Sequence, residues 1–202
     1  MKKLVKRLLF CLVLAVMFWL GALVADRQTL DDALIRLHVV ANSDTEADQR
    51  IKLQVRDAIL SSIGQSLSEA TSREEAYAYL KENLPKIQSI ANTVLEQAGV
   101  EPSAVVSLCK ESFDTRIYDS FMLPAGVYDA LRITIGEGAG HNWWCVAFPS
   151  LWETGPDQFV DDAVEAGLSS QLSHAMAGEP EYEVRFFLLE ALGKLENMLH
   201  AE

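Results

Sequence analysis

The chain begins with a segment that is too apolar for an ordinary protein surface. Four basic residues, Lys2, Lys3, Lys6 and Arg7, precede eighteen consecutive apolar residues, 8–25. A positive region followed by an apolar run is typical of an export signal whose positive end stays in the cytoplasm. The run also falls within the roughly 17–25 residues that a transmembrane helix needs. The sequence therefore predicts export, with residues 1–25 acting as a cleaved signal peptide or a retained signal anchor.

The rest of the chain is strongly acidic. It keeps all 29 Asp and Glu residues but only 13 of the 17 Lys and Arg residues, and the whole chain has a formal net charge of −12. Such a surface repels the phosphate backbone of nucleic acids and the anionic headgroups of lipids. We expect no nucleic-acid partner, and membrane contact only through the N-terminal segment if it is retained.

Residues 26–32 form a short polar stretch, which predicts a linker, and residues 33–202 are enough for a single exported domain. A strand is expected within 33–41. Ser43 and Glu46 have the spacing of a capping box for a helix that would end near Gly64. A second helical region is expected from Ser72 to Gly99, with Pro85 causing a kink or dividing it into two helices.

Residues 124–149 have the pattern of a strand, a glycine turn and a second strand. Leu131, Ile133 and Ile135 alternate with more polar positions, which predicts one buried face. Gly136–Gly140 suit a short hairpin connection. Further strands are expected at 105–111 and 182–189, with helices in 152–177 and at the end. The fold class is therefore α+β, an antiparallel sheet with a central hairpin and helices packed on at least one side.

Two long blocks also carry a family resemblance. They read IRLHVVANSDTEADQRIKLQVRDAIL at 35–60 and PAGVYDALRITIGEGAGHNWWCVAFP at 124–149. Both resemble the signature blocks of the stage II sporulation protein R family of endospore-forming bacteria, and they occur in the expected order.

The resemblance implies a function that residue patterns alone do not indicate. Proteins of this family are made in the forespore and exported into the space between the two sporulation membranes. There they activate a membrane-embedded aspartic protease of the mother cell, which cleaves the inactive precursor of sigma factor E. By this resemblance the chain is a protein ligand for that protease rather than an enzyme.

Four residues are candidates for partner binding. Asn42 and Asp44 lie at a strand-to-helix corner, where small polar side chains either bond their own backbone or contact a partner. Trp143 and Trp144 are neighbours on a strand, so they must face opposite sides of the sheet. An exposed tryptophan beside a polar turn would be a good interface anchor.

Other chemistry is weakly indicated. Cys109 and Cys145 form either a disulfide, which export would permit, or two separate buried thiols. Cys145 with His141 or His38 is the basis of an alternative function, a cell-envelope cysteine hydrolase acting on peptidoglycan. The four histidines have no metal-ligand spacing. We therefore assign no catalytic residue, metal or cofactor.

Overall fold

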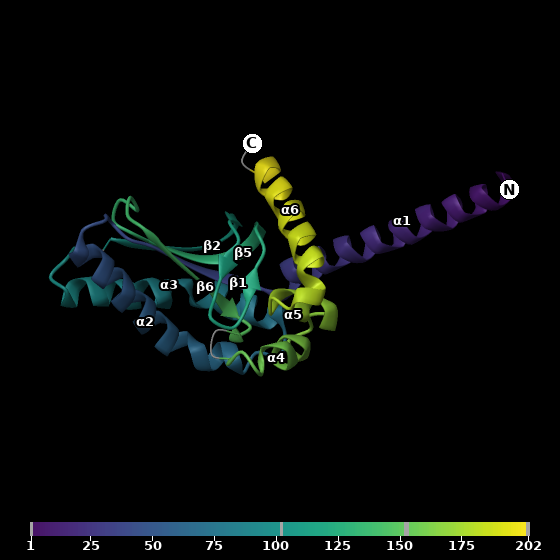
Figure 1. Ribbon diagram of the computed structural model, residues 1–202. Coiled ribbons are helices and arrows are strands. Elements are labelled where there is room, and N and C mark those ends of the chain that lie inside the picture. The colour runs from purple at the N-terminus through teal and green to yellow at the C-terminus, as the bar shows by residue number, and fades with distance from the viewer. Residues whose placement is uncertain (1, 102, 152–153, 201–202) are drawn as a thin grey trace.

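The computed structural model describes residues 2–101, 103–151 and 154–200. A long helix, α1 (Lys2–Ala33), projects from an α+β body (Figure 1). By length and composition α1 is able to cross a membrane, and its apolar side chains from Leu4 to Leu20 are exposed. A signal peptide and a signal anchor would both look like this.

The C-terminal end of α1 is part of the folded body. Residues 26–32, expected to be a linker, are helical and continue α1 without a break. Leu23 and Leu30 on this end, with Leu34 just after it, are buried in the same hydrophobic cluster as residues of the C-terminal half; we call this cluster the second core. The sequence did not indicate this packing, because the leucines stand among polar residues, two of which, Asp26 and Arg27, are themselves buried.

Partly buried ion pairs fix this end of α1 to the C-terminal helix α6 (Glu183–His200). Asp26 accepts a hydrogen bond of 2.6 Å from Arg185. Arg27 donates to Glu196 at 2.8 Å and to the Tyr128 hydroxyl at 2.9 Å. Breaking a buried pair by removing one partner leaves an uncompensated charge, so these contacts set where the apolar helix leaves the body.

The main sheet has four strands in the order β2-β5-β1-β6. They are β1 (Ile35–Val40), β2 (Ala104–Phe113), β5 (Gly126–Ile135) and β6 (Asn142–Phe148). β1 pairs in parallel with β5 and antiparallel with β6, while β2 pairs antiparallel with β5. The short strands β3 (Arg116–Ile117) and β4 (Met122–Leu123) form a separate antiparallel pair. The fold class α+β is confirmed, but the main sheet is mixed.

The expected central hairpin is wrong in one important respect. β5 and β6 are joined by the glycine turn, yet they do not pair with each other because β1 lies between them. All six residues of β1 are buried, as expected for a central strand covered on both faces. The turn must therefore span two inter-strand spacings, about 10 Å, across the end of β1.

Helices α2 (Glu46–Ser68) and α3 (Arg73–Gln97) cover one face of the sheet (Figure 1). The alternation in β5 is confirmed, because Leu131, Ile133 and Ile135 all join the core under these two helices. α2 continues past Gly64, and α3 continues through Pro85 as one helix. Packing of the apolar stripes of α2 and α3 outweighs the helix-breaking tendency of Gly64 and Pro85. The stripes consist of Val55, Ile59, Ile63 and Leu67 on α2, and Ala76, Leu80, Ile87, Ala91 and Leu95 on α3.

The opposite face is covered by the end of α1 and by the C-terminal elements. These are α4 (Phe159–Glu165), α5 (Ser170–Met176), a 3-10 turn (Pro180–Tyr182) and α6. The strand expected at 182–189 is wrong, since α6 begins at Glu183. Its buried residues Phe186, Leu189 and Gly193 follow a helical period that β-favouring side chains obscured.

Leu30→Ala should lower the free energy of unfolding by about 2–5 kcal/mol, because it removes a fully buried side chain from the second core. Gln28→Ala, on the exposed side of the same helix turn, should change it by less than about 0.5 kcal/mol. Urea denaturation of the full chain in detergent, followed by circular dichroism, measures both. Equal stability of the two variants would show that the end of α1 does not belong to the core.

Candidate partner-binding site

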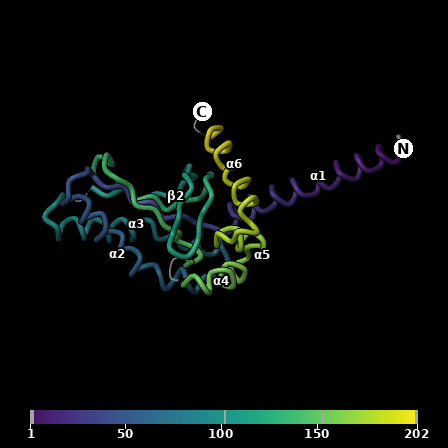
Figure 2. Tube along the Cα trace, viewed as in Figure 1, coloured from purple at the N-terminus to yellow at the C-terminus, as the bar shows by residue number. Residues whose placement is uncertain are grey.

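The two signature blocks meet at one end of the sheet, where residues 41–44 contact the turn formed by residues 136–141. We call these contacts the loop clasp; Figure 2 shows the two segments side by side. Asn42 Oδ1 accepts a hydrogen bond of 3.0 Å from the backbone of Glu137, and its Nδ2 donates to Asp48 at 3.0 Å. The backbone N–H groups of Ala139 and Gly140 donate to the carbonyls of Asn42 and Ala41. Both polar ends of the Asn42 side chain are thus used within the protein.

Asp44 belongs to the same clasp but is more accessible. Its Oδ1 accepts a 2.6 Å hydrogen bond from the His141 backbone and lies 2.5 Å from His141 Nδ1. The two side chains are 55% and 79% exposed, so both remain available to a partner. The hydrogen bond from the His141 side chain, reinforced by its backbone N–H, holds the pKa of Asp44 below its usual value of 3.8.

The helix start at this corner differs from the expected capping box. α2 begins two residues later than the Ser43 cap implies, and Thr45 is the N-cap, accepting a bond from the Asp48 backbone. Ser43 instead donates to the Asp48 carboxylate at 2.5 Å. This bond and the one from Asn42 lower the pKa of Asp48. The corner therefore needs two more residues than a direct strand-to-helix junction, because it also holds the glycine turn.

Two glycines make the close approach possible. A Cβ atom at Gly136, which has φ +56°, would lie 2.2 Å from Asn42 Oδ1. A Cβ atom at Gly140 would lie 2.3 Å from the backbone oxygen of Ser43. Neither position tolerates a side chain without displacement of the opposing loop.

Trp143 and Trp144 face opposite sides of the sheet, as predicted. Trp143 packs against the core under α2 and α3, and Trp144 against the second core. Each ring is partly exposed and carries a guanidinium, with Arg56 Cζ 4.6 Å from the Trp143 ring centre and Arg116 Cζ 3.6 Å from that of Trp144. Neither ring is fully buried or fully exposed; both are half-buried, and each is capped by a cation.

A groove runs along the outer edge of β6, with a volume of about 630 Å³. Its lining comes from residues 142–145 of β6, residues 116–118 at β3, and Arg56, Asp57 and Leu60 of α2. We call it the edge groove. β6 is an edge strand whose first residue is exposed and whose next two are partly exposed, so the groove brings Asn142 together with the two Arg–Trp pairs.

A fully buried arginine lies directly behind the edge groove. Arg36 of β1 donates to the carbonyl of Cys145 at 3.3 Å and to the hydroxyl of Tyr118 at 3.0 Å. It stacks 4.2 Å from the centre of the Phe113 ring. Next along the strand, His38 stacks on Trp144 and bonds Glu111. Our reading of the sequence missed Arg36, although a charged residue inside an apolar strand was the signal.

The structure does not join Cys109 and Cys145. Both thiols are free, and they lie on β2 and β6, the two opposite edges of the sheet. Three strand spacings of about 4.8 Å separate those edges, which is far beyond the reach of a disulfide. The two residues also face opposite sides, because Cys145 joins the core under α2 and α3 whereas Cys109 pairs with Ala130 of the second core.

The same placement removes the geometric basis for a cysteine hydrolase. Burial raises the pKa of the Cys145 thiol, which disfavours the thiolate. His38 packs in the second core, on the other side of the sheet from Cys145. His141 is exposed and bonded to Asp44. Neither histidine therefore forms a nucleophile–base pair with this thiol.

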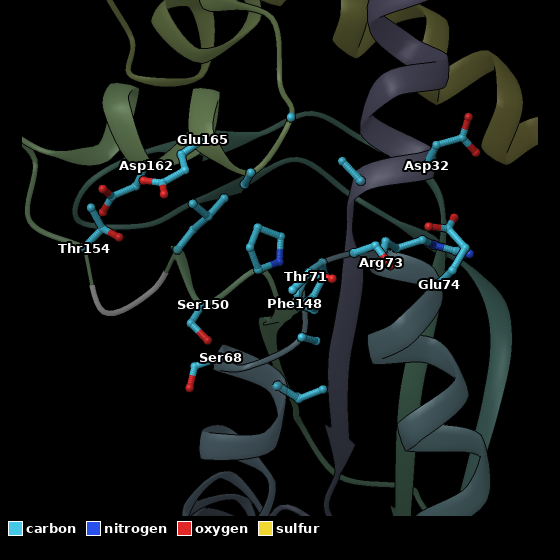
Figure 3. A pocket seen from close by; sticks show the side chains of 18 of the residues that line it. Asp32, Ser68, Thr71, Arg73, Glu74, Phe148, Ser150, Thr154, Asp162 and Glu165 are labelled. Carbon is cyan, nitrogen blue, oxygen red and sulfur yellow. The ribbon is translucent and has the colours of Figure 1, made fainter.

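A second pocket, of about 670 Å³, lies where α1, α3, α4 and the end of β6 meet (Figure 3). Asp32, Arg73 and Glu74 lie on one side of it, and Asp162 and Glu165 on the other. Arg73, the basic residue among these five, forms an ion pair with Asp129. Among the described residues, no group of three or more His, Cys, Asp or Glu side chains is placed to hold a metal ion.

Gly140→Ala should destabilise the protein by about 1–3 kcal/mol, because the added methyl group would overlap the Ser43 carbonyl. Gly64→Ala is the matched control: no atom lies within 4 Å of its added Cβ, and alanine favours the helix by about 0.5–1 kcal/mol. Thermal unfolding of both variants tests the clasp. A neutral Gly140→Ala would mean that the two loops do not touch.

His141→Ala should raise the pKa of Asp44 toward 3.8, because it removes the side-chain hydrogen bond that favours the carboxylate. Since the folded-state pKa is depressed, the stabilisation from this contact is present above the unfolded value and is lost as the pH falls through the folded value. An NMR titration of the Asp44 carboxyl measures the shift. An unchanged midpoint in the variant would contradict the contact.

The part of the chain that contains these features is matched in the comparison with known proteins. A family model for stage II sporulation protein R matches residues 31–155, a range that contains β1, both signature blocks, the loop clasp and the edge groove. The chain is 43% identical over 122 residues to the stage II sporulation protein R of Bacillus subtilis (strain 168). That alignment covers 60% of this chain and 54% of the relative, so the chain spans about half the length of the curated protein it matches. No solved structure matches. The chain belongs to the stage II sporulation protein R family.

Proposed function

We propose that this protein is an exported signal of endospore formation that activates a membrane-embedded aspartic protease, leading to processing of the inactive sigma-E precursor. Family membership is the observation that carries the proposal. The N-terminal helix supports the export step, because it begins with basic residues and then continues as an apolar segment long enough to cross a membrane. The site of action would be the space between forespore and mother-cell membranes.

The arrangement of α1 supports action close to a membrane. The last turns of α1 pack into the body and are held by the Asp26–Arg185 and Arg27–Glu196 pairs. If the helix is retained as an anchor, the body starts at the membrane surface with no flexible linker. A receptor embedded in the facing membrane would then meet a domain of fixed orientation.

Activation by contact makes a thermodynamic demand on the binding surface. A ligand shifts a receptor toward its active arrangement only by the amount that it binds that arrangement more tightly than the inactive one. Each tenfold preference corresponds to about 1.4 kcal/mol. Half-buried tryptophans capped by arginines are the kind of residue that supplies such differences at interfaces. We therefore infer a signalling role rather than a catalytic one, with Trp143 and Trp144 as partner-contact residues.

The test is reconstitution of the protease and its precursor substrate in liposomes, with the full-length protein added. Precursor cleavage should require this protein, and Trp144→Ala should slow cleavage at least tenfold because it removes a central contact. Lys81→Ala, an exposed change on α3, should have no effect. Thermal melting of both variants checks folding. Cleavage at the full rate without the protein would refute the proposal.

A further inference from the structure

The edge groove combines the accessible first residues of an edge strand with positive charge, on a protein that is otherwise acidic. Asn142 is exposed and Trp143 and Trp144 are partly exposed, whereas residues 145–148 of β6 are buried. Edge strands present unpaired N–H and C=O groups, and natural proteins usually cover or charge them. β2, at the other edge, is covered in part: Asn92 and Gln88 of α3 accept hydrogen bonds from the backbone of Ala104 and Val106. Within the described residues, the main chain of β6 receives one side-chain hydrogen bond, from Arg36 to the carbonyl of Cys145.

The charges that line the edge groove favour binding of an anion. Arg56 and Arg116 line the groove, against one acidic residue, Asp57, in a chain whose net charge is −12. Asp57 pairs with Arg56. Arg116 stacks on Trp144, and its buried Nε has no hydrogen-bond partner among the described residues.

Arg36 adds a buried, incompletely satisfied cation behind the same strand. It is 0% exposed, and its Nη1 has no hydrogen-bond partner among the described residues. Its other contacts are a carbonyl and the phenol of Tyr118, both of which line the groove. A buried guanidinium that bonds neutral groups raises the local positive potential, because the dielectric response of the interior is low.

We propose that the edge groove binds an extended acidic segment of a partner protein, which pairs as a short added strand with the accessible residues 142–144 of β6. Main-chain hydrogen bonds to β6 would supply affinity, while Arg56 and Arg116 would select carboxylates on alternate residues. The volume of about 630 Å³ is within the range of peptide- and ligand-sized sites. This inference rests on the proposed function only in naming the receptor as the source of the segment.

A second copy of the chain is a poorer occupant. A two-fold β6–β6 pairing is self-complementary, so each groove would face its own duplicate. Arg56 and Arg116 of one copy would then lie near those of the other, and like charges across an interface are unfavourable. An acidic strand would instead place its carboxylates beside Arg56 and Arg116.

The binding test uses a defined probe, the heptapeptide acetyl-Val-Glu-Val-Glu-Val-Glu-Val-amide, and the full-length protein in detergent. NMR should place the largest amide shifts on residues 142–144, the accessible part of β6. A peptide with Lys in place of Glu, and one with alternate backbone nitrogens methylated, should each bind at least tenfold more weakly. Shifts centred elsewhere, equal affinity for the Lys peptide, or dimerisation through β6 without peptide would overturn the proposal.

Protein variants make the test independent of folding. Ile117→Glu adds a negative charge at the rim of the groove, where the side chain is 77% exposed, and should weaken binding of the acidic peptide at least fivefold. Val105→Glu is the matched control at the opposite edge of the sheet, where the side chain is 61% exposed. Unaltered binding in Ile117→Glu with an unaltered melting temperature would refute the assigned groove.

The outcomes also separate this inference from the proposed function. If Ile117→Glu lowers both peptide binding and protease activation, both are supported. If the peptide binds at β6 as described but the protease needs no activator, the proposed function fails and the groove remains. If activation requires the protein but the acidic peptide does not bind at β6, the groove inference fails and the signalling role remains.

Discussion

The position of β1 between β5 and β6 determines most of what is distinctive in this protein. All of its residues are buried, and its neighbours come from the second signature block, so the two blocks form one structural unit. The turn from β5 to β6 must cross the end of β1, which brings it against residues 41–44. The loop clasp follows from that crossing, and so does the need for glycine at 136 and 140. β6 is then left at the edge of the sheet, where its outer side lines a groove.

The electrostatics of the sheet are arranged around this edge. An acidic chain would be expected to surround its arginines with carboxylates, as it does for the buried Arg27 with Glu196 and for the partly buried Arg73 with Asp129. Arg36 is instead surrounded by aromatic rings, a phenol and a carbonyl. Such contacts offset part of the free energy needed to remove a cation from water, but they do not neutralise its charge. The remaining positive potential lies behind the edge groove, next to the accessible first residues of β6.

Local elements could be predicted because they depend on local patterns. The apolar stripes, the Ser72 cap of α3 and the alternation in β5 are visible within short windows. The strand order could not be predicted, because the insertion of β1 between β5 and β6 depends on contacts about a hundred residues apart in the chain. The free cysteines, the Arg–Trp pairs and the edge groove all follow from that order. Within α6, β-favouring side chains concealed a helical period that became clear only against the second core.

The most direct test of the central claim, that this protein acts by contact through the β6 edge, is site-specific photo-crosslinking in liposomes that contain the protease. A photoreactive residue in place of Ile117, at the edge groove, should yield a crosslink to the protease. The same residue in place of Val105, at the opposite edge, should not. Crosslinks of equal yield from both positions, or a crosslink from Val105 alone, would contradict the account.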